Sequence, residues 1–213
     1  PNIEGGRDLE ALGLAREAAE AASVPLMVHI GGSPSPLREI LAMLRPGDVV
    51  THAFRRVGSI LDEDGRVMSE ALEASERGIH FDIGHGAGNF SFDTAEKLIS
   101  QGVLPDVISS DVHERNAAGP VFGLLTTLSK FLSLGLTLEQ VIERGATNPA
   151  RIFGLSDRLG TLRQGAEADV ALFTLSEGRF ELVDSGGDTR VGDRMLHPFA
   201  TIKGGRAFGA INA

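Results

Sequence analysis

The sequence contains no cysteine, tryptophan or tyrosine, and it has no long apolar run. Without cysteine there are neither disulfides nor thiolate metal sites, so imidazole, carboxylate and water remain as metal ligands. Without tryptophan and tyrosine, recognition in a pocket depends on charged, backbone and small polar groups. No stretch approaches the roughly 18 uninterrupted apolar residues that a membrane span needs, and the first residues lack signal-peptide character. We therefore expect a soluble, cytoplasmic protein.

Basic residues are scarce relative to acidic ones. The 213 residues include 29 Asp and Glu against 20 Lys and Arg, which gives a formal net charge of −9. This balance lacks the electrostatic footprint of a protein that binds nucleic acid or anionic lipid. With 42% hydrophobic and 23% charged residues, the composition is that of a globular protein with a sizeable core. The expected partner is a small molecule, with neither nucleic acid nor membrane as a partner.

Apolar periodicity predicts strands and helices in alternation over most of the chain. The expected helices are 8–22, 37–44, 68–77, 93–101, 121–134 and 137–143, and the expected strands between them are 26–30, 48–52, 79–83 and 107–110. Each of these strands is short and nearly all apolar, as burial on both faces of a parallel sheet requires. Strands that alternate with helices in this way favour parallel pairing through right-handed crossovers.

Four strand–helix repeats predict about half of a parallel (β/α)8 barrel, since the closed form takes roughly 250 residues. From Gly160 the pattern changes to short apolar runs at 168–175, 179–183 and 199–203. The expected fold class is therefore α/β. We expect a partial (β/α)8 TIM-like barrel (strands five to eight) over residues 1–157, followed by a β-rich, sandwich-type segment over residues 158–213.

The chain begins with proline and enters a helix almost at once, so we interpret it as a fragment of a longer protein. Half a barrel would leave strands 26–30 and 107–110 as unpaired apolar edges, which invite pairing with another chain. We therefore expect either a homo-oligomer or completion of the barrel by a missing N-terminal half.

Each of three candidate metal ligands follows an apolar run. His29 ends Val-Pro-Leu-Met-Val-His, His52 ends Gly-Asp-Val-Val-Thr-His, and Asp111 ends Pro-Asp-Val-Ile-Ser-Ser-Asp. A parallel barrel collects its reactive groups at the carboxyl ends of its strands, so these side chains converge if the strands are neighbours. Two imidazoles and a carboxylate suit a divalent metal and together indicate a hydrolytic metal site. A single histidine at a strand end is more often a structural residue, which stays the alternative at each position.

Four motifs resemble the fifth to eighth strands of the amidohydrolase superfamily. They are His-Ile-Gly-Gly at 29–32, Thr-His-Ala-Phe at 51–54, Phe-Asp-Ile-Gly-His-Gly at 81–86 and Ser-Ser-Asp-Val-His at 109–113. The branch that they resemble most is the dihydroorotase-like amidohydrolase/deacetylase group of metallohydrolases. Thr-Asn-Pro-Ala at 147–150, with Gly-Thr-Leu at 160–162 and Ala-Asp-Val at 168–170, is similar to the signature with which this superfamily leaves its barrel for a β-sandwich.

The resemblance implies a role for each candidate ligand. His29 matches the metal-binding histidine of strand five, His52 that of strand six, and Asp111 the strand-eight aspartate that binds metal and shuttles the proton. The implied cofactor is Zn²⁺, as one or two ions, or another divalent metal. The His-x-His pair of strand one and the carboxylated lysine of strand four do not lie within these 213 residues, so the chain would supply part of the ligand set.

The expected activity is hydrolysis of an amide, or an ester, of a small molecule by metal-activated hydroxide. This is the chemistry of a zinc-dependent amidohydrolase/deacetylase acting on C–N bonds other than peptide bonds, with Asp111 as the catalytic proton shuttle. Two alternatives stay open. One is cyclic amide hydrolysis of the dihydroorotase or hydantoinase type, and the other is a non-catalytic barrel fragment that acts as a binding or assembly module.

Three further residues are candidates for substrate contact. His113 lies two residues beyond Asp111, so an extended chain would aim both side chains to the same side. His85 lies in a glycine-rich loop after a predicted strand, and Arg55 directly follows the His52 region with a guanidinium that matches a carboxylate. The alternatives are a loop histidine that makes a backbone hydrogen bond and a solvated Arg55–Arg56 pair.

Overall fold

The computed structural model describes residues 6–209 of the chain; residues 1–5, on which the interpretation as a fragment rests, lie outside it. The helices are α1 (Asp8–Ala21), α2 (Leu37–Met43), α3 (Ser69–Glu76), α4 (Phe92–Ser100), α5 (Leu124–Ser133), α6 (Leu138–Ile142), the π-helical turn η1 (Glu143–Thr147) and α7 (Asn148–Ile152). The strands are β1 (Met27–His29), β2 (Val49–Thr51), β3 (His80–Asp82), β4 (Val170–Val183), β5 (Thr189–Lys203) and β6 (Arg206–Gly209). The predicted α/β class is confirmed.

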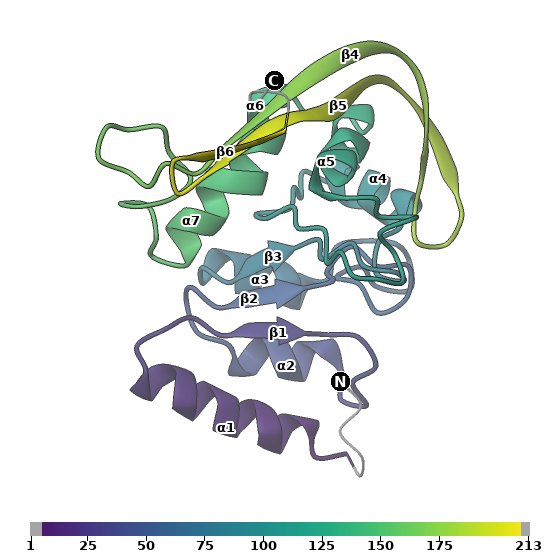
Figure 1. The fold of residues 1–213 in the computed structure, drawn as a ribbon. Helices are drawn as coiled ribbons and strands as arrows, with labels where there is room; N and C mark the ends of the chain where they lie inside the picture. The colour runs from purple at the N-terminus through teal and green to yellow at the C-terminus, as the bar shows by residue number, and fades with distance from the viewer. Residues whose placement is uncertain (1–5, 210–213) are drawn as a thin grey trace.

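The first three strands form a parallel sheet in the order β1-β2-β3. Val49 and Val50 in the middle strand are fully buried, because the sheet is covered on both faces as parallel sheets are. Figure 1 shows α2 and α3 behind the strands and α1 below β1. All three strands run in the same direction, so their carboxyl ends open onto one side of the molecule, which is where the candidate ligands lie.

The predicted strand 107–110 does not form as a regular strand. One parallel bridge joins Val107 to Asp82, and the backbone beyond it follows β3 through bonds such as that from the His85 N–H to the Ser109 carbonyl. Side chains here accept some of the backbone N–H groups that would otherwise pair with a strand. The Phe81 N–H donates to the Asp106 carboxylate and the Gly84 N–H donates to the Ser109 hydroxyl. These side-chain bonds compete with strand pairing, and a period-2 pattern does not reveal them.

Three helical segments follow one another where a single helix 137–143 was predicted. The first, α6, begins with a capping box in which the Thr137 hydroxyl accepts from the Gln140 N–H. The helical path then continues through η1 into α7. Pro149 has no N–H and cannot close an α-helical bond, so a wider turn carries the chain past this position.

The C-terminal region is a long β4–β5 hairpin with the short β6 added, in the order β4-β5-β6. The predicted runs 168–175 and 179–183 are one strand, because a register shift between Glu177 and Phe180 lets β4 continue past a break in the pattern. Over residues 6–209 this region holds one three-stranded sheet, and the predicted sandwich of two facing sheets is not seen.

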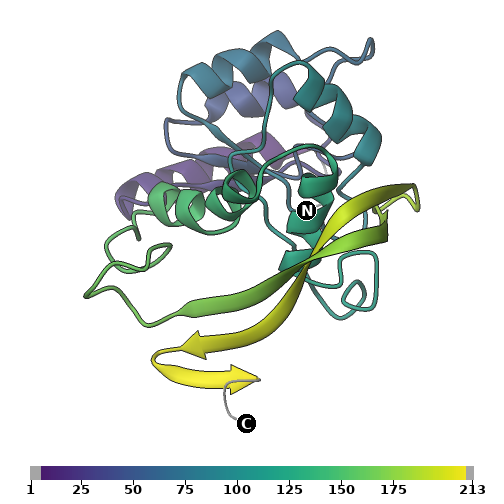
Figure 2. The same ribbon diagram turned by 90° about the horizontal axis from the view of Figure 1, so that it is seen from above.

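The hairpin lies across α5, as the view from above in Figure 2 shows. Leu182 and Leu196 are buried in the same hydrophobic cluster as the residues around the parallel sheet. The Leu196 N–H also donates to the Ser129 hydroxyl at 3.0 Å. The division at residue 157 stays a prediction, but the two parts share a core. Within residues 6–209, no helix combines the length and apolar character needed to cross a bilayer.

Candidate functional site

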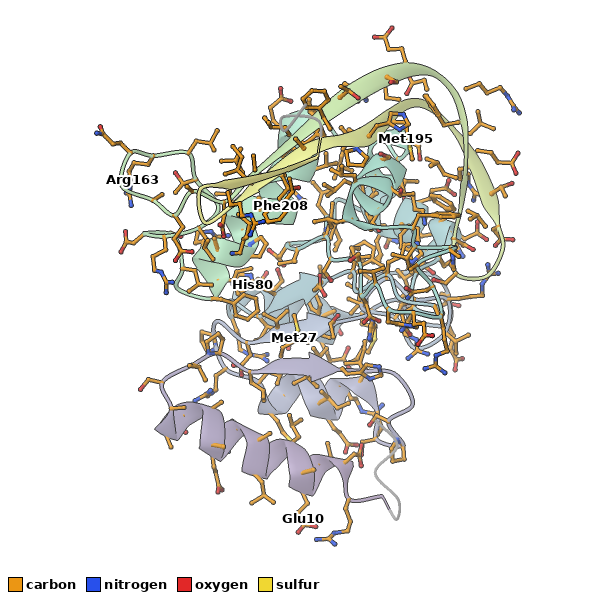
Figure 3. All side chains as sticks on the ribbon, in the orientation of Figure 1. Glu10, Met27, His80, Arg163, Met195 and Phe208 are labelled. Atoms are coloured by element: carbon orange, nitrogen blue, oxygen red, sulfur yellow. The ribbon has the colours of Figure 1, made fainter. Side chains whose placement is uncertain are left out.

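His29 and His52 lie side by side at the ends of two neighbouring strands. His29 is the last residue of β1, and His52 directly follows β2, with Thr51 opposite His29 in the sheet register. The two imidazole rings meet edge to face, with centroids 4.4 Å apart and planes at 83°. His80, labelled in Figure 3, lies at the other end of the sheet, where β3 begins. The strand ends thus bring together two of the three predicted ligands.

His52 is held in one orientation. Its side chain is buried, its backbone is left-handed with φ 70°, and its Nδ1–H donates to the Gly84 carbonyl at 2.6 Å. Burial is the largest effect that lowers the pKa of His52, and the neighbouring His29 lowers it further. The ring is therefore neutral at pH 7 with its lone pair on Nε2, which is the form that binds a metal ion.

His29 is more exposed and differs in its hydrogen bonding. Its Nδ1 accepts the Gly31 N–H at 3.0 Å, so the neutral ring carries its proton on Nε2. Partial burial lowers the pKa of His29, and Arg55 contributes in the same direction. Coordination through Nε2 would require the other tautomer and the loss of the Gly31 contact.

Asp111 lies close to both rings. Its charge acts to raise the pKa of His29 and of His52. Its backbone is left-handed with φ 45°, and the buried Asn116 fixes the turn by donating to the Asp111 carbonyl at 2.9 Å while accepting from the His113 N–H at 2.7 Å. Its carboxylate rests against Gly86, where a Cβ would come within 2.5 Å of Oδ2. The sequence did not indicate this role of Asn116, because an asparagine in a loop gives no sign that its side chain will bridge two backbone groups.

The chemistry of the three side chains fits a divalent metal, but their arrangement does so only in part. Two neutral imidazoles and a carboxylate are a ligand set suited to zinc. Within residues 6–209, however, no group of three or more histidine, aspartate and glutamate side chains is arranged to hold a metal ion. His52 presents a free lone pair, whereas His29 does not. The predicted metal site stays a prediction.

The two adjacent arginines have separate environments. Arg55 lies beside His29, since a Cβ at Gly31 would come within 2.7 Å of Arg55 Nη1 and 2.6 Å of His29 Cε1. Its Nε is buried and has no hydrogen-bond partner in the described part of the chain. Arg56 instead pairs with Asp188 at the tip of the β4–β5 hairpin. Substrate contact by Arg55 stays a prediction.

His85 is fully buried, which favours a structural role over the predicted substrate contact. Its Nδ1–H donates to the Gly86 carbonyl at 3.0 Å, and its Nε2 accepts from Lys130 Nζ at 2.6 Å. Lys130 is itself fully buried on α5 and also donates to the Pro120 carbonyl. Burial lowers the pKa of His85 to about 3 and that of Lys130 to about 7. A lysine in an apolar helix gave no indication of this pairing.

The His113 ring forms a hydrogen bond within its own loop. Its Nδ1 accepts the Arg115 N–H at 3.2 Å, the loop hydrogen bond given above as its alternative. The ring is half-buried next to the Asp111 turn. Substrate contact by His113 stays a prediction.

A polar network beneath the two histidines was also missed. The buried carboxylate of Asp82, at the end of β3, accepts Thr51 Oγ1–H at 2.6 Å and Ser109 Oγ–H at 2.8 Å, both on Oδ2. Burial raises the pKa of Asp82, while the two hydroxyl bonds oppose that shift. The motif Phe-Asp-Ile-Gly-His-Gly contains Asp82, but its position inside a predicted apolar strand concealed its role.

Comparisons with known proteins give a consistent result. The family described as a deacetylase-like composite domain matches residues 162–209. A protein from Brucella anthropi named "Deacetylase" is 39% identical over 209 residues, which are 98% of this chain and 52% of that protein. A crystal structure of an adenine deaminase aligns with a TM-score of 0.88 and 39% identity over 93% of this chain and 55% of the other. For a dihydroorotase the TM-score is 0.81 and the identity 38%, over 92% of this chain and 52% of the other. The chain thus spans about half the length of each of these relatives.

Proposed function

Since the chain belongs to the deacetylase and dihydroorotase-like group of the amidohydrolase superfamily, we propose that the intact protein hydrolyses an amide bond, or an ester, of a small molecule with the help of a divalent metal. The observation that carries this proposal is the pair of neutral imidazoles, His29 and His52, at adjacent strand ends with Asp111 nearby. The relatives named as deacetylase, adenine deaminase and dihydroorotase support hydrolytic chemistry at C–N bonds.

His52, His29 and Asp111 are the residues that we propose hold the metal, which we expect to be zinc. A bound divalent metal supplies polarisation of the scissile carbonyl and lowers the pKa of water from about 16 toward 7. His52 has its lone pair in place for this role, because Gly84 fixes its proton on Nδ1. His29 would give up its contact with the Gly31 N–H and move its proton to Nδ1 in order to hold the metal.

Asp111 is the proposed proton shuttle. Its carboxylate is exposed and lies within electrostatic reach of both imidazoles. It accepts the proton of the attacking water and delivers it to the leaving amine or alkoxide. The left-handed turn that Asn116 clasps keeps the carboxylate in place during both transfers.

Arg55 is the proposed contact for a substrate carboxylate. Its guanidinium lies next to His29 and is not engaged by the hairpin, unlike that of Arg56. A guanidinium binds a carboxylate through two parallel hydrogen bonds, so an N-acylated amino acid or a related acid fits this group.

Replacement of Asp111 tests the shuttle. In the intact protein, Asp111→Asn should lower kcat by orders of magnitude while most of the zinc is retained, because the amide still offers an oxygen ligand but does not take up a proton. The measurements are zinc content by elemental analysis and turnover on N-acyl amino acids, cyclic imides and acyl esters. Asp193→Asn, at a side chain that is 84% exposed on β5, is the matched control and should leave kcat unchanged. A kcat near that of the wild type in Asp111→Asn would exclude the shuttle.

The same screen separates the alternatives. Turnover of cyclic imides in preference to N-acyl amino acids would favour the dihydroorotase type. Zinc-free protein without turnover would favour a binding or assembly module. A cytoplasmic location and a homo-oligomer, or completion by an N-terminal half, remain proposals alongside the activity.

A further inference from the structure

Both backbone polar groups of Gly84 are engaged. Its carbonyl accepts the Nδ1–H of His52 at 2.6 Å, and its N–H donates to the Ser109 hydroxyl at 3.2 Å. Its backbone is left-handed, with φ 48°, and a Cβ here would come within 2.3 Å of Thr51 Oγ1 and 2.6 Å of His52 Nδ1. The backbone position of this one residue therefore determines how the His52 ring is oriented.

Asp82 anchors the other end of the connection. Ser109 Oγ accepts from Gly84 and donates its own proton to Asp82 Oδ2 at 2.8 Å, so the hydroxyl is used in both senses. Thr51 donates to the same oxygen from the neighbouring strand at 2.6 Å. Asp82 Oδ1 is buried and has no hydrogen-bond partner among the described residues, so Oδ2 carries both side-chain bonds.

We propose that Asp82 and Ser109 are positioning residues, which hold the Gly84 backbone so that its carbonyl keeps the proton of His52 on Nδ1 and leaves Nε2 free. The inference rests on the proposed function for its catalytic consequence, since a free Nε2 matters through the metal that His52 would bind. Hydrogen bonds to the second ring nitrogen fix the tautomer of ligand histidines in metal sites generally. Here the connection runs through a hydroxyl and the backbone of one residue, Gly84.

Thr51 and Ser109 provide a matched pair of tests, because each donates one hydroxyl proton to the same carboxylate oxygen but, of the two hydroxyls, only that of Ser109 hydrogen-bonds to the Gly84 backbone. Ser109→Ala should move His52 from a single Nδ1–H tautomer to a mixture of both. Thr51→Val should leave the single tautomer unchanged. The probe is ¹⁵N–¹H correlation of the imidazoles in the metal-free intact protein at pH 8, with the His52 signals assigned by their loss in His52→Asn.

Zinc affinity is the second measurement, made by competition with a chelator. Loss of a residue that orients a ligand lowers metal affinity roughly 10-fold to 100-fold, which is the loss expected for Ser109→Ala. Thr51→Val should stay within about threefold of the wild type. Asp82→Ala should change the His52 tautomer and the zinc affinity as Ser109→Ala does. If the Asp82 variant does not fold, Ser109→Ala, the smaller change, still provides the test.

The outcomes separate the inference from the proposed function. An unchanged His52 tautomer in Ser109→Ala, or an equal change in Thr51→Val, would overturn the positioning role even where the wild type binds zinc. A tautomer change confined to Ser109→Ala and Asp82→Ala would support it. If the wild-type protein does not bind zinc but the variants show that tautomer pattern, the proposed metal site is rejected and the positioning role of Ser109 and Asp82 is retained.

Discussion

At the scale of single residues, His52 and Asp111 share an uncommon backbone conformation. Both have positive φ. Among the non-glycine residues of 6–209, only Ser23 and Phe122 share this property. Such conformations cost free energy and persist where surrounding contacts impose them, often at functional sites. Here Gly84 and Asn116 supply those contacts. The sequence indicated both candidate ligands through their place after apolar runs, but the residues that hold them gave no pattern to detect.

Gly84→Ala should be the most damaging small change at the site. A Cβ would clash with Thr51 and His52, and the left-handed backbone adds strain of about 1–2 kcal/mol. We expect a loss of unfolding free energy of at least that size together with weaker zinc binding, measured by urea unfolding and chelator competition. Gly88→Ala is the control in the same loop, because nothing lies within 4 Å of its Cβ position. Equal effects of the two changes would contradict the close packing.

Lys130 should make stability depend on pH in the alkaline range. Burial lowers its pKa from an ordinary 10.5 to about 7, so between these values the unfolded chain binds more protons than the folded chain. The unfolding free energy should therefore rise from pH 7.5 to pH 9.5, by at most about 1.4 kcal/mol per pH unit. The window is clear of cysteine and tyrosine, which the chain lacks. Urea unfolding of Lys130→Met should show a flatter dependence, and an unchanged slope would refute the assignment.

At the scale of elements, the β4–β5 hairpin is the feature that local pattern described least well. Helices α1 to α4 and strands β1 to β3 match the predicted ranges to within a residue or so at each end, because periodicity and turn residues act locally. The sequence pattern of the hairpin predicts separate short runs, since a bulge interrupts its alternation. Its contact with α5 joins residues 67 positions apart and its contact with the loop after β3 joins residues 100 positions apart, and no local pattern encodes such separations.

The hairpin tip is held by Asp184, a buried carboxylate. It accepts the N–H groups of Gly186 and Asp188 within the tip and that of Phe92 at the start of α4. Asp184→Asn places an amide where an acceptor is needed, and we expect a loss of about 1.5–3 kcal/mol in unfolding free energy. Urea unfolding measures this loss. Asp193→Asn, on the exposed part of β5, should change the unfolding free energy by less than about 0.5 kcal/mol. Similar losses in both variants would show that the hydrogen bonds of Asp184 do not stabilise the tip.

At the scale of the whole molecule, β1 leaves one side of the parallel sheet open. Among the described residues it pairs with β2 alone, and a groove of about 340 Å³ between α1 and β1 is lined by apolar side chains such as Leu12, Leu26 and Met27. Unpaired apolar edges template the addition of another strand. The sequence predicted this edge, because four strand–helix repeats do not close a barrel, but it did not identify what covers it.

The 213-residue chain should therefore self-associate through β1. Met27 is 45% exposed, and Met27→Lys places a charge at this edge that opposes strand addition. Light scattering should show association of the wild-type chain and a shift toward monomer in Met27→Lys. Leu162→Lys, at an 82% exposed loop residue far along the chain, is the control and should associate as the wild type does. A monodisperse wild-type monomer would contradict the prediction.

The shared core of the parallel sheet and the hairpin has a consequence for any attempt to separate them. Polypeptide ending at residue 157 would lack Leu182 and Leu196, and the apolar side of α5 would face water. The glycine loop after β3 would also lose the Ser185 hydroxyl that ties its His85 and Gly86 carbonyls to the tip. Limited proteolysis between the two parts should thus yield fragments that stay associated, and removing the C-terminal fragment should loosen the very loop on which His52 depends.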